Sequence, residues 1–262
     1  MSSLVYLLGP AGCGKSTLTS ALSVLMQSNG LKVVTVNLDP GVEWLPYTPD
    51  IDIRTHVSLR EVMKEFKLGP NGGLIVAVDL MAEHLPKLRQ LIVEWNADYV
   101  LVDTPGQMEL FAFRRTGPAV IEGLGDVQRS CLLFLIDSFF AKQASSFVSM
   151  LMLASSVLAR FRLPQINVLT KIDRLTANEL QMTAGWMERK DLLLDAILSE
   201  PNPLDRETAM GMLEVVEKTS LAGELVPISA TENRGLLELV GVIERVLAKE
   251  TVLDLGEEVE KY

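Results

Sequence analysis

The sequence predicts a three-layer α/β fold, in which a mostly parallel β-sheet lies between helices. Several short runs are apolar at every position rather than at alternate positions, which is typical of strands buried on both faces. These runs span residues 4–8, 33–37, 99–102, 131–136 and 166–169, with a shorter candidate at 225–228. Helical patterns separate the runs, and this alternation indicates a doubly wound sheet.

Helical patterns between these strands define one domain. They span residues 16–27, 59–66, 80–95, 109–122, 140–160 and 236–249. A further stretch at about residues 176–222 has several helical patterns and no strand pattern, with breaks at Gly185 and at residues 201–203. We therefore expect a single domain over residues 1–250 with a helical insertion, or lid, in that stretch. An acidic tail at residues 251–262 should follow it, with no role beyond solubility.

The composition excludes several classes of protein. The chain has 262 residues and a net charge of −10, so its surface should repel a phosphate backbone, and we expect no direct nucleic-acid binding. No apolar run reaches the roughly 18 residues of a membrane span. Two cysteines and two histidines make a disulfide framework or a zinc cluster improbable. The N-terminus has no signal-peptide pattern, so we expect a cytoplasmic protein without a membrane anchor.

The strongest motif is GPAGCGKST, which fits the phosphate-binding pattern G-x-x-x-x-G-K-[ST]. It follows a predicted strand and precedes a predicted helix, the context that this motif requires. Glycines let the backbone approach phosphates closely, and a helix N-terminus supplies free N–H groups. Lys15 should reach the β- and γ-phosphates, and the Ser16 hydroxyl should bind Mg²⁺. The predicted phosphate-binding residues are Gly12, Cys13, Gly14, Lys15, Ser16 and Thr17.

A second motif, DTPGQ, follows the predicted strand at residues 99–102. Asp103, at the strand end, could hold Mg²⁺ through water, and the Gly106 N–H could meet the γ-phosphate. Gln107 could orient the attacking water. The composition alone would also suit a simple turn. Because a P-loop precedes it in the chain, we interpret it as a switch element.

A third motif, TKID, follows the predicted strand at residues 166–169 and indicates guanine recognition. The Asp173 carboxylate can accept hydrogen bonds from guanine N1–H and its exocyclic amine, a pair of donors that adenine lacks. The Lys171 stem can pack on the base. Thr170 stands where asparagine is commoner, which should weaken the bracing of this loop. Ser229 and Ala230 form a weaker motif, whose backbone N–H could meet guanine O6.

Two further segments indicate which kind of P-loop protein this is. NLDPG closes the predicted strand at residues 33–37, and GPN stands at residues 69–71. The ordered set GPAGCGKST, NLDP, GPNGG, DTPGQMEL and TKID resembles the GPN-loop GTPases from about residue 4 to 250. The short tail looks more like that of the archaeal members of this family.

The resemblance implies dimers whose two nucleotide sites face each other, with GTP, GDP and Mg²⁺ bound. Asn71 of one subunit would act at the nucleotide of the other, across the face that carries the GPN segment. Asp39, Gln107 and Glu109 would hold Mg²⁺ or order the attacking water. Asp39 could instead start a turn, although its place at a strand end favours a ligand role. Glu109 could equally be a first-turn acid stabilised by the helix dipole.

Two functions of different classes follow. The first is a Mg²⁺-dependent GTPase acting as a dimeric switch. The alternative is a nucleotide-gated assembly factor or scaffold for RNA polymerase or another complex, in which hydrolysis only resets binding of an unidentified protein client. A nickel-delivery GTPase is disfavoured because the chain has no histidine-rich tract or CxxC pair. Pro10 and Ala11 disfavour a dimer-type ATPase, which carries a second lysine early in its P-loop.

Overall fold

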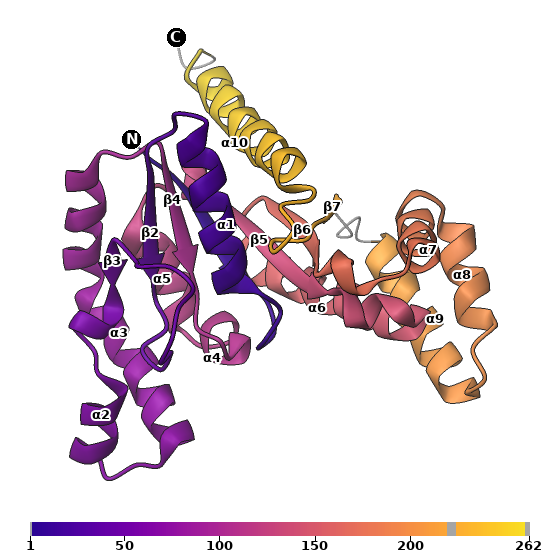
Figure 1. The fold of residues 1–262 in the computed structure, drawn as a ribbon, viewed down its shortest axis with the longest axis horizontal. Coiled ribbons are helices and arrows are strands. Elements are labelled where there is room, and N and C mark those ends of the chain that lie inside the picture. The colour runs from indigo at the N-terminus through magenta and orange to yellow at the C-terminus, as the bar shows by residue number, and fades with distance from the viewer. Residues whose placement is uncertain (1, 219–223, 260–262) are drawn as a thin grey trace.

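The computed structural model describes residues 2–218 and 224–259, with side chains described as far as residue 248. Within these residues one sheet of seven parallel strands has the order β3-β2-β4-β1-β5-β6-β7 (Figure 1). The strands are β1 (Ser3–Leu8), β2 (Val33–Asn37), β3 (Ile51–Asp52), β4 (Tyr99–Asp103), β5 (Ser130–Asp137), β6 (Gln165–Thr170) and β7 (Leu225–Pro227). The predicted fold class is therefore confirmed.

Helices cover both faces of this sheet. The described helices are α1 (Lys15–Ser28), α2 (Leu59–Glu65), α3 (Pro70–Trp95), α4 (Met108–Ala112), α5 (Thr116–Leu124), α6 (Ala144–Phe161), α7 (Ala177–Glu188), α8 (Lys190–Leu198), α9 (Pro203–Lys218) and α10 (Leu236–Val259). Of these, α3, α5 and α6 lie on one face of the sheet, and α1 and α10 lie on the other. Alternate residues of β1 enter opposite layers, as the two-residue period of a strand requires. Leu4 and Tyr6 join the core beneath α3, α5 and α6, whereas Val5 and Leu7 join the core beneath α1 and α10.

Two of the predicted helices differ from the observed ones. One lies next to the GPN segment, and the other follows the DTPGQ segment. The helix predicted from residue 80 already begins at Pro70, with Gly69 as its N-cap, so GPN is the start of α3. Proline suits the first helical position because its missing N–H would be unpaired there anyway. The helix predicted over residues 109–122 is interrupted and forms α4 and α5. The chain folds back tightly at this break, since a Cβ on Gly117 would lie 2.2 Å from the Phe111 carbonyl oxygen.

Helices α7, α8 and α9 occupy residues 177–218 of the predicted insertion, and residues 219–222 lie outside the described part. The predicted break at Gly185 is wrong, because this glycine lies inside α7. A capping box of Thr176 and Glu179 fixes the start of α7, and one glycine is tolerated in a helix at a cost of about 1 kcal/mol. Residues 251–259, predicted as a tail, continue α10, whereas 260–262 lie outside the described part.

Helix α6 is, within the described residues, long and apolar enough to cross a membrane by length and composition. Its side chains Phe147, Val148 and Leu151 are buried in the core on the sheet. The helix also packs along α9 of the insertion. Packing against the sheet and against α9 therefore accounts for the apolar composition of α6.

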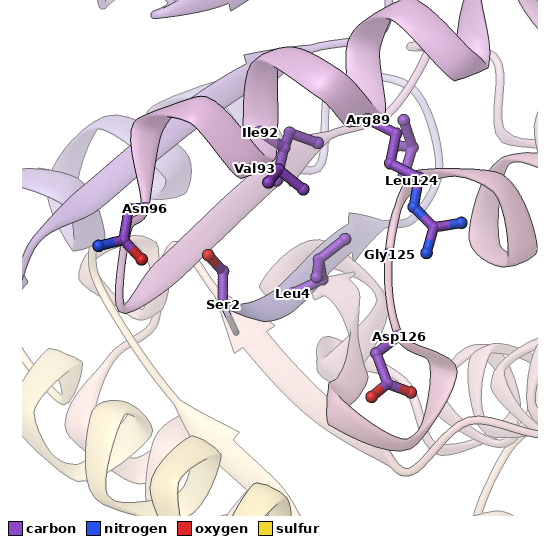
Figure 2. A pocket seen from close by; sticks show the side chains of 9 residues that line it. All are labelled: Ser2, Leu4, Arg89, Ile92, Val93, Asn96, Leu124, Gly125 and Asp126. Atoms are coloured by element: carbon purple, nitrogen blue, oxygen red, sulfur yellow. The ribbon is translucent and has the colours of Figure 1, made fainter.

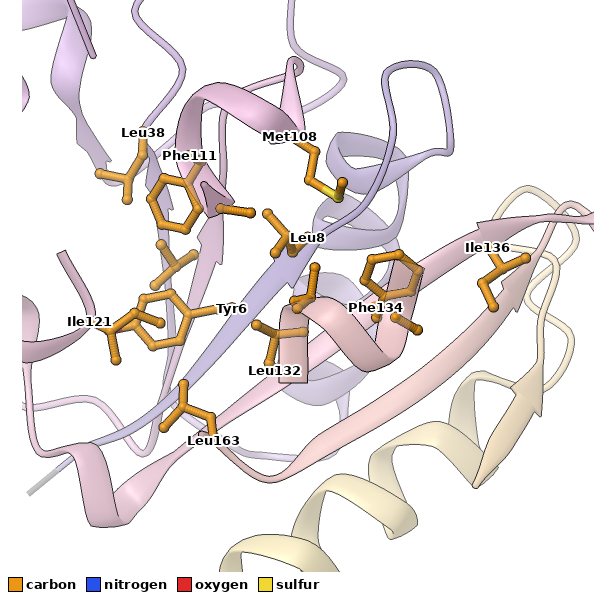
Figure 3. Close-up of a cluster of buried hydrophobic side chains, with 14 of the residues drawn as sticks. Tyr6, Leu8, Leu38, Met108, Phe111, Ile121, Leu132, Phe134, Ile136 and Leu163 are labelled. Atoms are coloured by element: carbon orange, nitrogen blue, oxygen red, sulfur yellow. The ribbon is translucent and has the colours of Figure 1, made fainter. Parts of the chain in front are cut away.

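Tyr6 supplies a test of the core. Its ring is fully buried among Phe111, Ile121 and Leu132 (Figure 3), and its hydroxyl has no hydrogen-bond partner within the described residues. Because an unpaired buried hydroxyl is destabilising, Tyr6→Phe should raise the free energy of unfolding by about 1 kcal/mol in urea titrations. Tyr99→Phe, at the half-buried start of β4, is the control and should change it little. A loss of stability in Tyr6→Phe would instead indicate that a buried water binds this hydroxyl.

Candidate nucleotide-binding site

The predicted motifs meet at the carboxyl ends of the central strands. Strand β1 lies between β4 and β5, with Leu7 paired to Asp103 and Leu8 paired to Phe134. Asn37 at the end of β2 is also paired to Asp103, and Asp137 at the end of β5 is paired to Thr170. This edge of an open parallel sheet is where such folds bind ligands. Segments far apart in the sequence are therefore collected around the loop that follows β1.

The loop after β1 has the backbone shape that its glycines permit. Gly12 and Gly14 adopt positive φ angles of 77° and 100°, which residues with a side chain rarely adopt. Gly14 is the N-cap of α1, so the unpaired N–H groups of the first helical turn border the loop. A Cβ on Gly9 would lie 2.6 Å from the Leu135 carbonyl oxygen on β5. The loop can therefore lie this close to β5 only with glycine at that position.

Lys15 lies inside this loop, and its side chain is buried. Its ammonium donates hydrogen bonds to the Gly9 carbonyl at 2.9 Å and the Pro10 carbonyl at 3.3 Å. It also lies 3.5 Å from the carbonyl oxygen of Gly106 in the DTPGQ segment. The lysine therefore connects the two segments that sequence analysis predicts to contact phosphate.

Asp103 is almost completely buried, with 2% of its surface exposed. Its Oδ2 accepts a hydrogen bond from the Tyr47 hydroxyl at 3.0 Å, whereas Oδ1 has no partner within the described residues. Burial raises the pKa of Asp103 to about 6, against the opposing effects of the Ser16 and Tyr47 hydroxyls and the Lys15 ammonium. Mg²⁺ prefers oxygen ligands. The unpaired Asp103 oxygen and the nearby Ser16 hydroxyl are oxygen atoms of this kind.

The described residues contain no cluster of three or more His, Cys, Asp or Glu side chains that could enclose a metal. Mg²⁺ does not need one, since it usually binds one or two protein oxygens together with waters and substrate phosphates. Ser16 and Asp103 therefore fit this ion better than they fit a metal that requires a complete protein cage.

Asp39 bridges the loop between β2 and β3 to the DTPGQ segment. Its Oδ2 accepts a hydrogen bond from the Gly106 N–H at 2.7 Å, and its Oδ1 accepts one from the Gly41 N–H at 2.9 Å. The buried Asn37 side chain accepts from the Asp39 N–H at 3.1 Å. The carboxylate therefore already binds the N–H that was predicted to meet the γ-phosphate. Its predicted roles toward Mg²⁺ and water stay predictions.

Thr170 braces the P-loop through its side chain. Its buried hydroxyl lies 2.8 Å from the Cys13 carbonyl oxygen and 3.2 Å from that of Ile136. Threonine therefore does brace this loop, through a hydroxyl that reaches the P-loop backbone. The predicted weakening relative to asparagine stays a prediction. Cys13 contributes its backbone carbonyl to this contact, and burial raises the pKa of its thiol.

Lys171 forms a second link between the TKID segment and the P-loop. Its ammonium donates to the Gly12 carbonyl at 2.5 Å and to Asp137 Oδ2 at 2.6 Å. The Ser138 hydroxyl donates to the Lys171 carbonyl at 2.9 Å. Asp137 and Ser138 were not among the predicted site residues, because their only sequence signal is their place at the end of a strand.

Asp173, Lys171 and Ala230 line one pocket next to the P-loop. The Ser229 hydroxyl donates to Asp173 Oδ1 at 2.6 Å, which ties the two predicted base-recognition segments together. The pocket has a volume of about 150 Å³, and its lining residues are Gly14, Thr17, Thr170, Lys171, Asp173, Arg174, Ile228, Ala230 and Thr231. It therefore joins the start of α1 to the residues predicted to bind the base.

Three predicted residues are not joined to this site by side-chain hydrogen bonds in the described part of the chain. Asn71 is exposed in the first turn of α3, and Glu109 is exposed in the first turn of α4. Gln107 is the half-buried N-cap residue of α4. Their catalytic roles stay predictions.

Another pocket, of about 260 Å³, lies at the opposite, amino end of the strands, beside the start of β1 (Figure 2). It is lined by Ser2, Leu4, Arg89, Ile92, Val93, Asn96, Leu124, Gly125 and Asp126. None of the predicted site residues is among these. The pocket beside the start of β1 is therefore separate from the candidate nucleotide site.

Known proteins are similar to this chain over most of its length. A family described as "Conserved hypothetical ATP binding protein" matches residues 7–249. GPN-loop GTPase 3 of Eremothecium gossypii is 38% identical over 246 residues, which cover 92% of this chain and 90% of that protein. GPN-loop GTPase 1 of Dictyostelium discoideum is 31% identical over 236 residues, 89% of this chain but only 59% of that longer protein.

A solved structure is similar over most of the chain. The crystal structure of a GTPase from Pyrococcus abyssi, in its apo form, has a TM-score of 0.82 and 30% sequence identity to this chain. The match covers 93% of this chain and 97% of the archaeal one. The similarity therefore includes the sheet, the P-loop and most of the remaining chain.

Proposed function

This chain belongs to the GPN-loop GTPase family and is thus a GTP hydrolase, and from that premise we propose that it acts as a Mg²⁺-dependent dimeric switch. The observation that carries the proposal is the convergence of Lys15, Asp103 and Asp173 at one edge of the sheet. Lys15 contacts both predicted phosphate-binding segments, and Asp173 lines the adjoining pocket. For GTP hydrolysis, Lys15 would act on the phosphates, Asp103 on Mg²⁺ and Asp173 on the base of the same nucleotide.

The base-binding residues favour guanine over the adenine of the family description. Ser229 donates to one oxygen of Asp173, and the carboxylate retains acceptor capacity for the two donors on the guanine edge. Adenine does not present this pair of donors, so it would leave the remaining acceptor capacity of the Asp173 carboxylate unused. Lys171 is tied to Gly12 and Asp137, which supports a fixed lysine stem against the base.

Ser16 and Asp103 would hold Mg²⁺, with Asp39 as a further candidate ligand. When bound, the ion would supply positive charge to the phosphate oxygens. Lys15 would add its own charge to the β- and γ-phosphates, and the N–H groups at the start of α1 would bind phosphate oxygens. The acidic chain would thereby concentrate its phosphate-binding groups in one local site.

Gln107 would orient the attacking water, with Glu109 as the second candidate. The water oxygen forms a bond to the γ-phosphorus while the bond from that phosphorus to the β–γ bridging oxygen breaks, which yields GDP and phosphate. Gly106 contacts both Lys15 and Asp39, so loss of the γ-phosphate would change contacts on either side of DTPGQ. This is the proposed switch.

The proposed dimer would use the edge that carries Asn71. Large apolar side chains are exposed on segments that leave this end of the sheet: Trp44 is 76% exposed, Phe66 49% and Phe113 49%. Such side chains favour burial against a second copy of the chain. We place the dimer in the cytoplasm, with an unidentified protein client and without direct contact to nucleic acid or membrane.

Mixing two inactive variants tests whether Asn71 acts in the partner's site. Asn71→Ala should bind GTP without hydrolysing it, and Lys15→Ala should fail to bind. In an equimolar mixture, a mixed dimer has one site with both an intact P-loop and an intact Asn71. Steady-state phosphate release should therefore return to about a quarter of the wild-type rate if subunits pair at random.

Size-exclusion chromatography of differently tagged subunits provides the control, since it shows whether mixed dimers form. If they form and stay inactive, Asn71 does not act across the interface. If Asn71→Ala alone retains the wild-type rate, this residue has no role in hydrolysis.

The alternative function, a nucleotide-gated assembly factor, is favoured by the surface of the helical insertion. A groove of about 740 Å³ along α7 and α8 includes Met182, Trp186 and Leu192 among its lining residues. Capture of a client equally well in the presence of GDP and a non-hydrolysable GTP analogue would exclude nucleotide gating.

A further inference from the structure

We propose that Tyr47 is a positioning residue, whose hydroxyl holds the Asp103 carboxylate ready for Mg²⁺ and couples the loop between β2 and β3 to the ion. The proposal rests on the Mg²⁺ site of the proposed function. Tyr47 belongs to none of the sequence motifs that indicated a nucleotide site.

The contact between these residues is specific to one carboxylate oxygen. The Tyr47 hydroxyl donates to Asp103 Oδ2 at 3.0 Å, and Oδ1 has no partner within the described residues. The hydrogen bond therefore restrains the carboxylate and leaves Oδ1 available as an acceptor.

A carboxylate in this setting needs such a restraint. Asp103 is 2% exposed, so few water molecules can orient it in the absence of the ion. Hydrogen bonds to a metal-binding carboxylate commonly change metal affinity by about 10- to 100-fold when they are removed. The Tyr47 hydroxyl occupies this supporting position with respect to Asp103.

The loop that carries Tyr47 contacts the DTPGQ segment twice. At its start, Asp39 accepts from the Gly106 N–H at 2.7 Å, and eight residues later Tyr47 binds Asp103. At its end, Asp50 Oδ2 accepts from the N–H and hydroxyl of Thr35 at 2.8 and 2.9 Å. Because Tyr47 is the contact of this loop with Asp103, we expect a shift of that carboxylate on ion binding to reach the loop through the Tyr47 hydroxyl.

The test is Tyr47→Phe, which keeps the ring and removes only the hydroxyl. GDP affinity is measured by calorimetry in EDTA and at a series of free MgCl₂ concentrations. We expect Tyr47→Phe to need about 10-fold more Mg²⁺ for half of the Mg²⁺-dependent gain in GDP affinity. Its affinity in EDTA should stay within about 2-fold of wild type, because the P-loop and base pocket are unchanged. Tyr99→Phe, at the opposite end of β4 from Asp103, is the matched control and should behave as wild type.

Trp44 gives an independent spectroscopic readout, since it is exposed on the same loop, three residues before Tyr47. Mg²⁺ added to the GDP complex should change tryptophan emission in wild type and less in Tyr47→Phe, and Trp44→Phe should identify its source.

Two outcomes overturn the role of Tyr47 alone: an unchanged Mg²⁺ midpoint in Tyr47→Phe, or an equal loss of GDP affinity with and without Mg²⁺, which indicates general damage to the loop. If wild-type GDP affinity does not depend on Mg²⁺, the proposed Mg²⁺ site itself fails, and the role of Tyr47 fails with it.

Discussion

Lys15→Ala is expected to raise the dissociation constants for GDP and GTP on the order of 10³-fold. The buried ammonium lies between the P-loop carbonyls and the DTPGQ segment, where it can reach phosphate without ordering a new side chain. Charge-assisted hydrogen bonds contribute about 1.5–3 kcal/mol each, so losing two of them accounts for a change of this size.

Calorimetric titration with GDP in the presence of Mg²⁺ measures this effect. Lys32→Ala is the control, because it removes an exposed lysine before β2 at the opposite edge of the sheet. The thermal midpoint of ligand-free Lys15→Ala should be recorded as well, since the lysine also binds two loop carbonyls. A folded Lys15→Ala protein with wild-type affinity would exclude this loop as the phosphate site.

Asp173→Asn is expected to weaken GTP binding by about 10³-fold and to create measurable binding of xanthosine triphosphate. An asparagine amide can donate to the C2 carbonyl of xanthine, whereas it faces the exocyclic amine of guanine with a second donor. Ser229 should retain its contact with the carbonyl oxygen of the asparagine, so the pocket itself should persist.

Competition between guanine and xanthine nucleotides for a fluorescent analogue separates specificity from general damage. A damaged pocket would bind neither guanine nor xanthine nucleotides, whereas a pocket with exchanged specificity would gain binding of xanthine nucleotides. Asp126→Asn, at the other edge of the sheet, is a suitable control because asparagine also serves as a cap at the start of a helix. Tight GTP binding by Asp173→Asn would show that this carboxylate does not read the base.

Strands of the fold could be predicted closely because each is marked by local composition. The buried run predicted at residues 33–37 is β2 without adjustment, and β1, β4, β5 and β6 differ from prediction by one residue at one or both ends. The two-residue β3 was missed, since so short a segment has no period to detect. The start of α3 was missed because GPNGG has a composition typical of turns, although Pro70 can occupy a first helical position.

Some residues of the candidate site could be predicted from local sequence, and others could not. Lys15, Asp103 and Asp173 stand in motifs of contiguous residues, and such motifs can be recognised without knowledge of the fold. Asp137 and Tyr47 have no motif around them, and each was found only through a contact with a residue distant in the sequence. Thr170 was recognised from its motif, but its contact with the Cys13 carbonyl was not, because that distance depends on how closely β6 approaches the P-loop.

By itself the sequence determined the parallel α/β fold, the phosphate loop and the preference for guanine, because local apolar runs and short motifs encode these properties. Only the tertiary structure decided which groups support that chemistry: Tyr47 on Asp103, Asp137 on Lys171, and Asp39 on the Gly106 N–H. The physical reason is that hydrogen bonds act over about 3 Å. The partners lie 34 to 67 positions apart in the chain, and only the packing of strand ends brings them within that distance.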